Sequence, residues 1–193
     1  MSSVLGKFTY YSQIFVRMSA AIAADQALWG IRCPPALGAS TQDKALKVRI
    51  RSLILTAACD AAVATSSQSY YVQKFTTSDL SGGTDLTAVI GKMNTNAPTS
   101  RVLNLQQSSG AGGLSGGTGI SQVFAQLGQP RNASSASISL GRPVGSGDAE
   151  VSTDDRWGAI VLLPGEGLYI KNTFLGVIGD LITGLMVWEE GTF

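Results

Sequence analysis

The feature that most constrains the fold is a strict alternation of apolar and basic residues at 46–51, within a strand predicted over residues 45–58. Three apolar residues there alternate with three basic ones: Leu46, Val48 and Ile50 with Lys47, Arg49 and Arg51. A period of two places the two sets on opposite faces of an extended strand. Beyond Arg51 the apolar residues Leu53 and Leu55 have the opposite parity. This switch predicts a β-bulge near Arg51 and Ser52, or burial of both faces beyond it.

Other short segments also predict strands, namely residues 70–75, 102–105, 156–163, 168–170 and 181–188. They are separated by loops rich in glycine, serine and threonine, such as 108–119. Four apolar residues in 120–127 instead fit one helical stripe and predict a short helix: Ile120, Val123, Phe124 and Leu127. Short strands and long polar loops, without a convincing long helix, predict an all-β antiparallel sandwich.

Residues 1–38 are expected to form an N-terminal arm or hairpin, followed by the sandwich domain in 39–193. The candidate contact residues in the arm are Phe8, Tyr10, Tyr11, Ile14 and Phe15, which are too apolar for a solvated tail. Ordinary termini are disordered unless something holds them. We therefore expect residues 1–24 to pack on a neighbouring subunit. The alternative is an edge strand of the chain's own sandwich.

Tryptophan marks further positions where the chain buries apolar surface. Trp157 and Trp188 lie on predicted terminal strands, and Trp29 lies in the N-terminal part. Each is expected to anchor the core or a subunit interface rather than to stack on a sugar. Trp29 and Trp188 complete the set of candidate interface residues.

The sequence contains no histidine and only two cysteines. Histidine is the usual acid or base at neutral pH and the commonest metal ligand, so its absence removes most enzyme classes. Cys33 and Cys59 lack the spacing of a metal or redox motif and are expected to be buried free thiols, although pairing stays possible. We expect a protein that is not an enzyme and needs no metal or cofactor.

Four remaining groups of residues have weak functional interpretations. Glycines in 112–119 lack the lysine and hydroxyl residue that end a phosphate-binding loop. Four acidic residues are close enough in sequence for a calcium loop but fit a solvated loop better: Asp148, Glu150, Asp154 and Asp155. Glu166 and Glu189 are a remote candidate for a glycosidase pair. The basic residues of 47–51 fit a solvated strand face better than a phosphate site.

Charged residues make up only 14% of the chain, and the net charge is +1. A charge this close to zero gives no field that attracts nucleic acid or a membrane surface, so neither is an expected partner. Low charge is typical of a hydroxyl-rich surface or of one that partners cover. Both interpretations stay open.

Several segments, taken in order, resemble the small jelly-roll virion proteins of tailed bacteriophages. They are the sequences Leu-Trp-Gly-Ile-Arg at 28–32, Val-Arg-Ile-Arg at 48–51, Ser-Gly-Gly-Thr at 81–84, Leu-Leu-Pro-Gly-Glu-Gly-Leu at 162–168 and Val-Trp-Glu-Glu at 187–190. The resemblance covers most of the chain from residue 28 onward. It implies a jelly-roll sandwich and supplies no catalytic residues.

The resemblance also implies a structural role in a virion. The expected function is a capsid cement or decoration protein that binds the major capsid protein as a homo-oligomer, with a trimer favoured. Its expected place is the outer capsid surface, after assembly in the host cytoplasm. Two alternatives remain: a receptor- or glycan-binding module of a fibre or spike, and a small jelly-roll major capsid protein.

Overall fold

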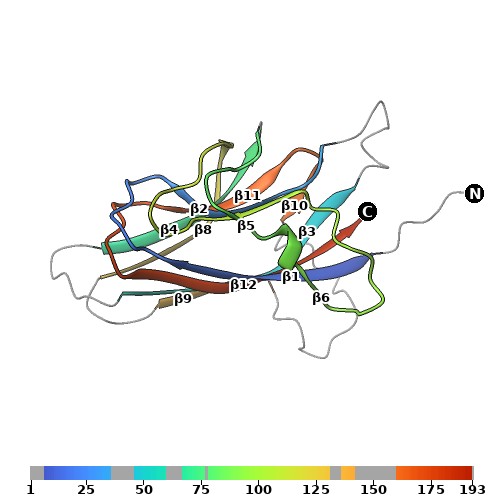
Figure 1. Cartoon of the computed structure of the whole chain (residues 1–193), viewed down its shortest axis with the longest axis horizontal. Helices are drawn as coiled ribbons and strands as arrows, with labels where there is room; N and C mark the ends of the chain where they lie inside the picture. The colour runs from blue at the N-terminus through green and yellow to red at the C-terminus, as the bar shows by residue number, and fades with distance from the viewer. Residues whose placement is uncertain are drawn as a thin grey trace, which may run out of the picture.

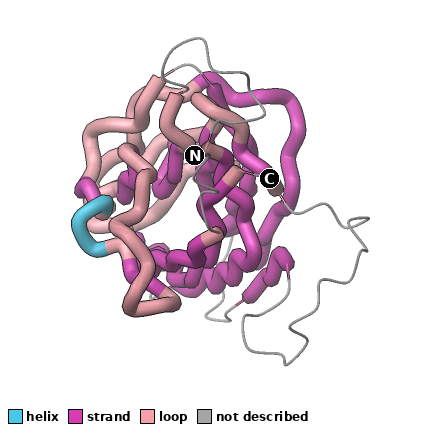
Figure 2. Tube along the Cα trace, turned by 90° about the vertical axis from the view of Figure 1, so that its right-hand side faces the viewer, coloured by secondary structure: helices cyan, strands magenta, loops and turns pink. Residues whose placement is uncertain are grey.

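The computed structural model describes residues 7–35, 46–59, 67–76, 78–130, 136–141 and 160–192. Its strands lie in two antiparallel sheets that face each other as layers (Figure 1). In these ranges, helix is confined to a single short turn, η2 (Thr87–Val89), which is the cyan segment of Figure 2. The predicted all-β antiparallel sandwich is confirmed.

Sheet 1 has the order β10-β3-β12-β1-β6, with β9 also paired to β3. Its strands are β1 (Phe8–Arg17), β3 (Lys47–Cys59), β6 (Gly91–Lys92), β9 (Ala136–Gly141), β10 (Val161–Leu162) and β12 (Asp180–Gly191). Sheet 2 has the order β5-β7-β2-β11-β4-β8. Its strands are β2 (Ala27–Arg32), β4 (Ser67–Thr76), β5 (Thr84–Asp85), β7 (Asn104–Gln107), β8 (Thr118–Pro130) and β11 (Gly167–Asn172).

The connectivity of these sheets is that of a jelly roll. The chain crosses between sheets at each step from β1 to β4, and again at each step from β8 to β9, from β10 to β11 and from β11 to β12. As a result, strands β1-β12-β3-β9 of sheet 1 lie over strands β2-β11-β4-β8 of sheet 2. Two four-stranded sheets linked in this way are the jelly-roll arrangement.

The hydrophobic core lies between the two sheets, and strand β3 shows how the sequence builds it. Val48 and Ile50 face the core, and Leu53 and Leu55 also do. The parity changes because the pairing with β12 shifts register there: Ser52 is opposite Val187, and Ile50 is opposite Trp188. The bulge predicted near Arg51 and Ser52 is confirmed, and it keeps both halves of β3 facing the core.

A long insertion between β4 and β8 supplies β5, η2, β6 and β7. Through β6 it pairs with β1, and through β7 it pairs with β2. Its glycine-rich part includes Leu114, which is buried in a second, smaller cluster with Phe75 and Tyr169. Tyr169 alternates along β11 with the core residues Leu168 and Ile170, so this cluster lies on the outer face of sheet 2.

The predicted helix in residues 120–127 is wrong, because these residues belong to strand β8. Strand β8 pairs with β4 from Ser67 opposite Pro130 to Thr76 opposite Thr118. An isolated helix of two turns is marginal in water, since nucleation is unfavourable. A continuous ladder with a neighbouring strand therefore outweighs the helical spacing of four apolar residues.

Residues 7–35, within the segment expected to form an arm or hairpin, contribute a strand to each sheet. Strand β1 pairs with β12 along its whole length, from Phe8 opposite Glu190 to Arg17 opposite Leu181. Strand β2 pairs with both β7 and β11 in the other sheet. The described part of the expected arm therefore supplies one strand to each layer: β1 alternates between buried and outward-facing residues, and β2 is buried at five consecutive positions.

Candidate functional site

The residues expected to contact a neighbour are divided between the two faces of β1. Tyr10 and Ile14 are buried in the core of their own subunit. Phe8 packs against that core, Tyr11 is half-buried, and Phe15 is 56% exposed. Strand alternation thus places Tyr10 and Ile14 on the core face of β1, within their own subunit. Tyr11 and Phe15 lie on the outer face of β1, and Phe15 is the more exposed of the two.

Both described tryptophans are core residues. Trp29 and Trp188 are fully buried in the cluster between the sheets. The Trp188 indole Nε1 donates a hydrogen bond to Glu190 Oε1 at 3.0 Å, and its ring lies 6.2 Å from that of Tyr10, centroid to centroid. Of the two roles expected for tryptophan, core anchor or interface anchor, Trp29 and Trp188 have the first. Trp157 lies outside the described residues.

Exposed apolar side chains gather in the turn between β11 and β12, residues 173–179, hereafter the apolar turn. Phe174, Leu175 and Ile178 are 52%, 56% and 61% exposed. No charged residue occurs between Lys171 and Asp180. Large apolar groups that stand together in water commonly mark a contact site, whereas single ones do not. The apolar turn is therefore the candidate functional site.

The backbone of the apolar turn is fixed by hydrogen bonds to the segment between β1 and β2. The Gly176 N–H donates to the Ile22 carbonyl at 2.7 Å, and the Ile22 N–H donates to the Gly176 carbonyl at 3.1 Å. The Gly179 N–H donates to the Met18 carbonyl at 2.9 Å. A side chain at Gly176 would overlap the sulfur of Met18, so glycine is required for this close approach. The three exposed side chains are thus presented on an ordered support.

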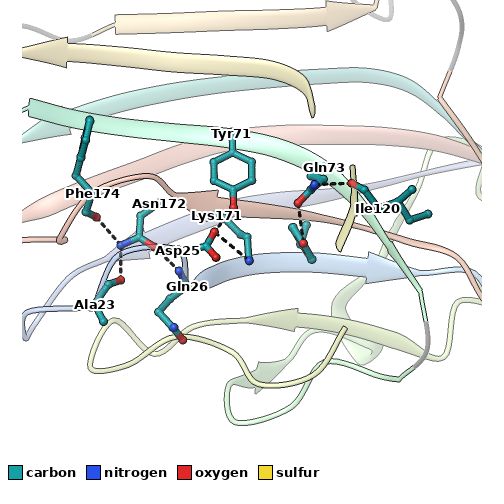
Figure 3. A network of polar contacts seen from close by, with 10 residues as sticks. Ala23, Asp25, Gln26, Tyr71, Gln73, Ile120, Lys171, Asn172 and Phe174 are labelled. Carbon is teal, nitrogen blue, oxygen red and sulfur yellow. Dashed lines mark hydrogen bonds and ion pairs between the residues drawn. The ribbon is translucent and has the colours of Figure 1, made fainter. Parts of the chain in front are cut away.

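Asn172, at the end of β11, fixes the start of the apolar turn (Figure 3). The side chain is buried. Its Nδ2 donates to the carbonyl oxygens of Ala23, at 2.7 Å, and Phe174, at 2.8 Å. Its Oδ1 accepts from the Gln26 N–H at 2.8 Å. One amide thereby satisfies three backbone groups in two separate segments, which is a structural role.

A charged cluster lies beside Asn172 in Figure 3. The Asp25 carboxylate accepts hydrogen bonds from the Tyr71 hydroxyl and from Lys171 Nζ, the latter at 3.1 Å. The hydrogen bond from Tyr71 lowers the pKa of Asp25, while burial raises the pKa of Tyr71. Lys171 Nζ also lies 5.0 Å from the centre of the Tyr169 ring. These groups neutralise one another and tie the β1–β2 turn to sheet 2.

The acidic residues considered for catalysis each have a structural partner. Glu166, in the turn before β11, accepts from Lys74 Nζ at 2.8 Å and from the Leu163 N–H at 2.9 Å. Glu189, on β12, forms an ion pair with Arg51 at 2.6 Å. The predicted acidic loop at 148–155 lies outside the described residues. Within the described ranges, no three histidine, cysteine or acidic residues are grouped to hold a metal ion.

The basic residues of β3 share the outer face of sheet 1, as the alternation predicted. Lys47, Arg49 and Arg51 are half-buried, while Val48 and Ile50 between them are buried. The ion pair of Arg51 with Glu189 favours the interpretation as a strand face over that as a phosphate site. Among the described residues, no helix is long and apolar enough to cross a membrane.

Cys33 is a free, buried thiol whose Sγ lies 3.3 Å from the Leu46 carbonyl oxygen, to which it donates. Burial raises its pKa to about 12, so the reactive thiolate is scarce at neutral pH. The side chain of Cys59 is outside the described part. Cys33 is therefore the inert, buried thiol expected from its sequence context.

Sequence reasoning missed the apolar turn, although a signal was present. Phe174, Leu175 and Ile178 were not among the predicted contact residues. The sequence Asn-Thr-Phe-Leu-Gly-Val-Ile-Gly at 172–179 combines two glycines with four large apolar residues and no charge. Because glycine commonly interrupts a strand, this sequence also fits a turn that carries exposed apolar side chains.

We expect Asn172→Asp to destabilise the protein by about 1–3 kcal/mol near neutral pH. The carboxylate would face the carbonyl oxygens of Ala23 and Phe174 without a proton to donate. The loss of stability should be smaller in acid, because a protonated carboxyl group can donate one hydrogen bond. Denaturant unfolding at several pH values measures it, with the exposed Asn96→Asp as control. Equal stability of the two variants would contradict the structural role of Asn172.

Comparisons with known proteins add little to this description. No family model matches the chain, and no curated protein matches it in sequence. Among solved structures, the chain is similar to one described as the structure of deformed wing virus carrying the GFP gene. The identity is 11%, the match covers 91% of this chain and 74% of that chain, and the TM-score is 0.28.

Proposed function

We propose that this chain is a structural protein of a virion, most specifically a cement or decoration protein that binds the lattice of a major capsid protein. It acts as a homo-oligomer on the outer surface of the capsid and has no catalytic role. The observation that carries this proposal is the combination of a charge-poor surface with grouped, exposed apolar side chains on a rigid sandwich.

The apolar turn provides one such group, and the insertion adds further exposed apolar residues. Val89, Met93 and Leu103 of the insertion are all exposed. Interfaces are depleted of charge at their centres, and only 14% of this chain is charged. When such side chains are buried against a neighbouring protein, the contact is stabilised by about 25 cal/mol for each Å² of apolar surface removed from water. This supports a subunit that works within a larger assembly.

The jelly-roll topology supports the same proposal from the fold. Most of the backbone is hydrogen-bonded in two sheets around one core. This gives a rigid subunit that can pack in many copies. Two alternatives share this topology: a major capsid protein, and a binding module of a fibre. They differ from a cement protein in what they assemble with.

The decisive experiment mixes the purified protein with undecorated capsids of the same virion and sediments the mixture. A cement protein should remain soluble alone, pellet with capsids at fixed stoichiometry and raise their resistance to heat. Formation of closed shells by the purified protein alone would replace the proposal with the major capsid role. Absence of capsid binding, together with binding to a glycan array, would replace it with the fibre role.

Replacing Phe174 and Leu175 together by serine should weaken capsid binding about tenfold or more, because both side chains lose apolar contact. Both are at least half exposed in the subunit, so the melting temperature should change little. The matched control replaces Val89 and Leu103, which are more exposed apolar residues of the insertion. If binding weakens only in the control, the insertion rather than the apolar turn is the contact surface.

A further inference from the structure

The two sides of the sandwich differ in how their sheet edges are covered. On one side the insertion adds strands beyond β1 and β2, and these outermost strands are very short. β5 and β6 each contain two residues, and each includes a charged one, Asp85 or Lys92. Short strands and charged residues are the usual protection of an edge against further pairing.

The opposite edge of sheet 2 is strand β8, which is built differently. It contains thirteen residues, whereas an average strand has about five or six. It pairs with β4 on one side, and Gln73 Nε2 also donates to the carbonyl of Ile120 to hold it there (Figure 3). Beyond β8, in the residues that the structure describes, sheet 2 has no further strand.

The sequence of β8 carries none of the usual charge protection. Between Thr118 and Pro130 there is no lysine, arginine, aspartate or glutamate. Its register with β4 shifts at two places, near Val72 and Gln73 and between Gln73 and Phe75, which twists the strand. The stretch from residue 126 to residue 130 continues in regular pairing beyond these bulges.

We propose that β8 is an assembly edge, at which this strand pairs with β8 of a second copy of the chain. An open ladder is matched by another extended strand, because its N–H and C=O groups alternate along the edge. Two identical strands pair antiparallel about a two-fold axis, and such a contact closes both open edges at once. Without charged residues, the two copies meet without like-charge repulsion.

This pairing goes beyond the proposed capsid role and does not depend on it. A two-fold contact through β8 also differs from the trimer that the resemblance implies, which would use another surface. Pairing through β8 alone gives dimers, whereas both contacts together give assemblies larger than either a dimer or a trimer.

The test is sedimentation velocity over a range of protein concentrations, with wild type, Gln126→Lys and Gln13→Lys. Gln126 and Gln13 are both exposed glutamines on strands, but Gln13 is on β1 in the other sheet. A lysine on β8 places like charges along the paired edges. We expect Gln126→Lys to weaken self-association about tenfold and Gln13→Lys to leave it unchanged.

Amide hydrogen exchange on the wild-type protein gives a second, independent readout. Amides of residues 119–129 should become more protected as concentration rises, while those of β5 and β6 should not. The proposal is overturned if the wild type remains monomeric at high micromolar concentration, or if protection on β8 does not depend on concentration. It is also overturned if Gln126→Lys associates as tightly as the wild type. Failure of capsid binding would leave all three readouts intact, so the two proposals fail separately.

Discussion

Replacing Trp188 by alanine is expected to lower the free energy of unfolding by about 3–5 kcal/mol, the range for deleting a large buried aromatic side chain. Trp188 is fully buried on β12, the strand that lies between β1 and β3 in sheet 1. Its removal leaves a cavity next to Tyr10. The strands on both sides of β12 prevent the surrounding residues from moving in to fill this cavity. A domain of this size commonly has only about 5–15 kcal/mol of stability.

The variant also disturbs a polar group. Glu190 is buried and accepts hydrogen bonds from the Ser100 hydroxyl, from the Arg101 N–H at 2.7 Å and from Trp188 Nε1 at 3.0 Å. Losing the indole leaves this carboxylate with one donor fewer. Trp188→Phe shifts the balance between the two effects, since it removes the hydrogen bond but keeps an aromatic ring and so leaves a much smaller cavity than alanine does. It should cost about 1–3 kcal/mol.

Denaturant unfolding, followed by the fluorescence of the remaining tryptophans, measures both variants. We expect the free energy of unfolding to be highest for the wild type, lower for Trp188→Phe and lowest for Trp188→Ala. Unchanged melting temperature and unchanged assembly of Trp188→Ala would show that the packing assigned to this residue is wrong.

The sequence predicted strands best where the face pattern is local. In residues 45–50 and 168–171, apolar and polar residues alternate, and each residue's face follows from its neighbours alone. The N-terminal strand was harder, because one buried position of the alternation is a serine, Ser12, between Tyr10 and Ile14. A polar residue on the core face hides the period of two.

Strand β8 and the apolar turn were missed for a different physical reason. The stripe of Ile120, Val123, Phe124 and Leu127 fits a helix locally, and only the ladder with β4 makes it a strand. The exposure of Phe174, Leu175 and Ile178 depends on a bridge between Gly176 and Ile22, which are far apart in sequence. Contacts of this kind have no signature in a single segment.

Gly110→Ala is the second substitution with a large expected effect, about 2–5 kcal/mol. Gly110 has φ +86°, a left-handed conformation that costs an L-residue about 1–2 kcal/mol. Its carbonyl accepts hydrogen bonds from the Ser19 N–H at 2.9 Å and the Ala20 N–H at 3.3 Å. An added Cβ would overlap the carbonyl oxygen of Arg17. Overpacking of this kind typically adds about 1–3 kcal/mol.

Two other glycines separate backbone strain from the steric overlap. Gly82 has the same φ of +86° but nothing within 4 Å of an added Cβ, so Gly82→Ala should cost only about 1–2 kcal/mol. Gly112 has open space as well and no positive φ, so Gly112→Ala should be neutral or slightly stabilising. Thermal unfolding of the three variants should therefore rank Gly112→Ala highest and Gly110→Ala lowest. If Gly110→Ala were no less stable than Gly82→Ala, the glycine-rich segment would not be packed against the end of β1, and its close contact with Arg17 would be wrong.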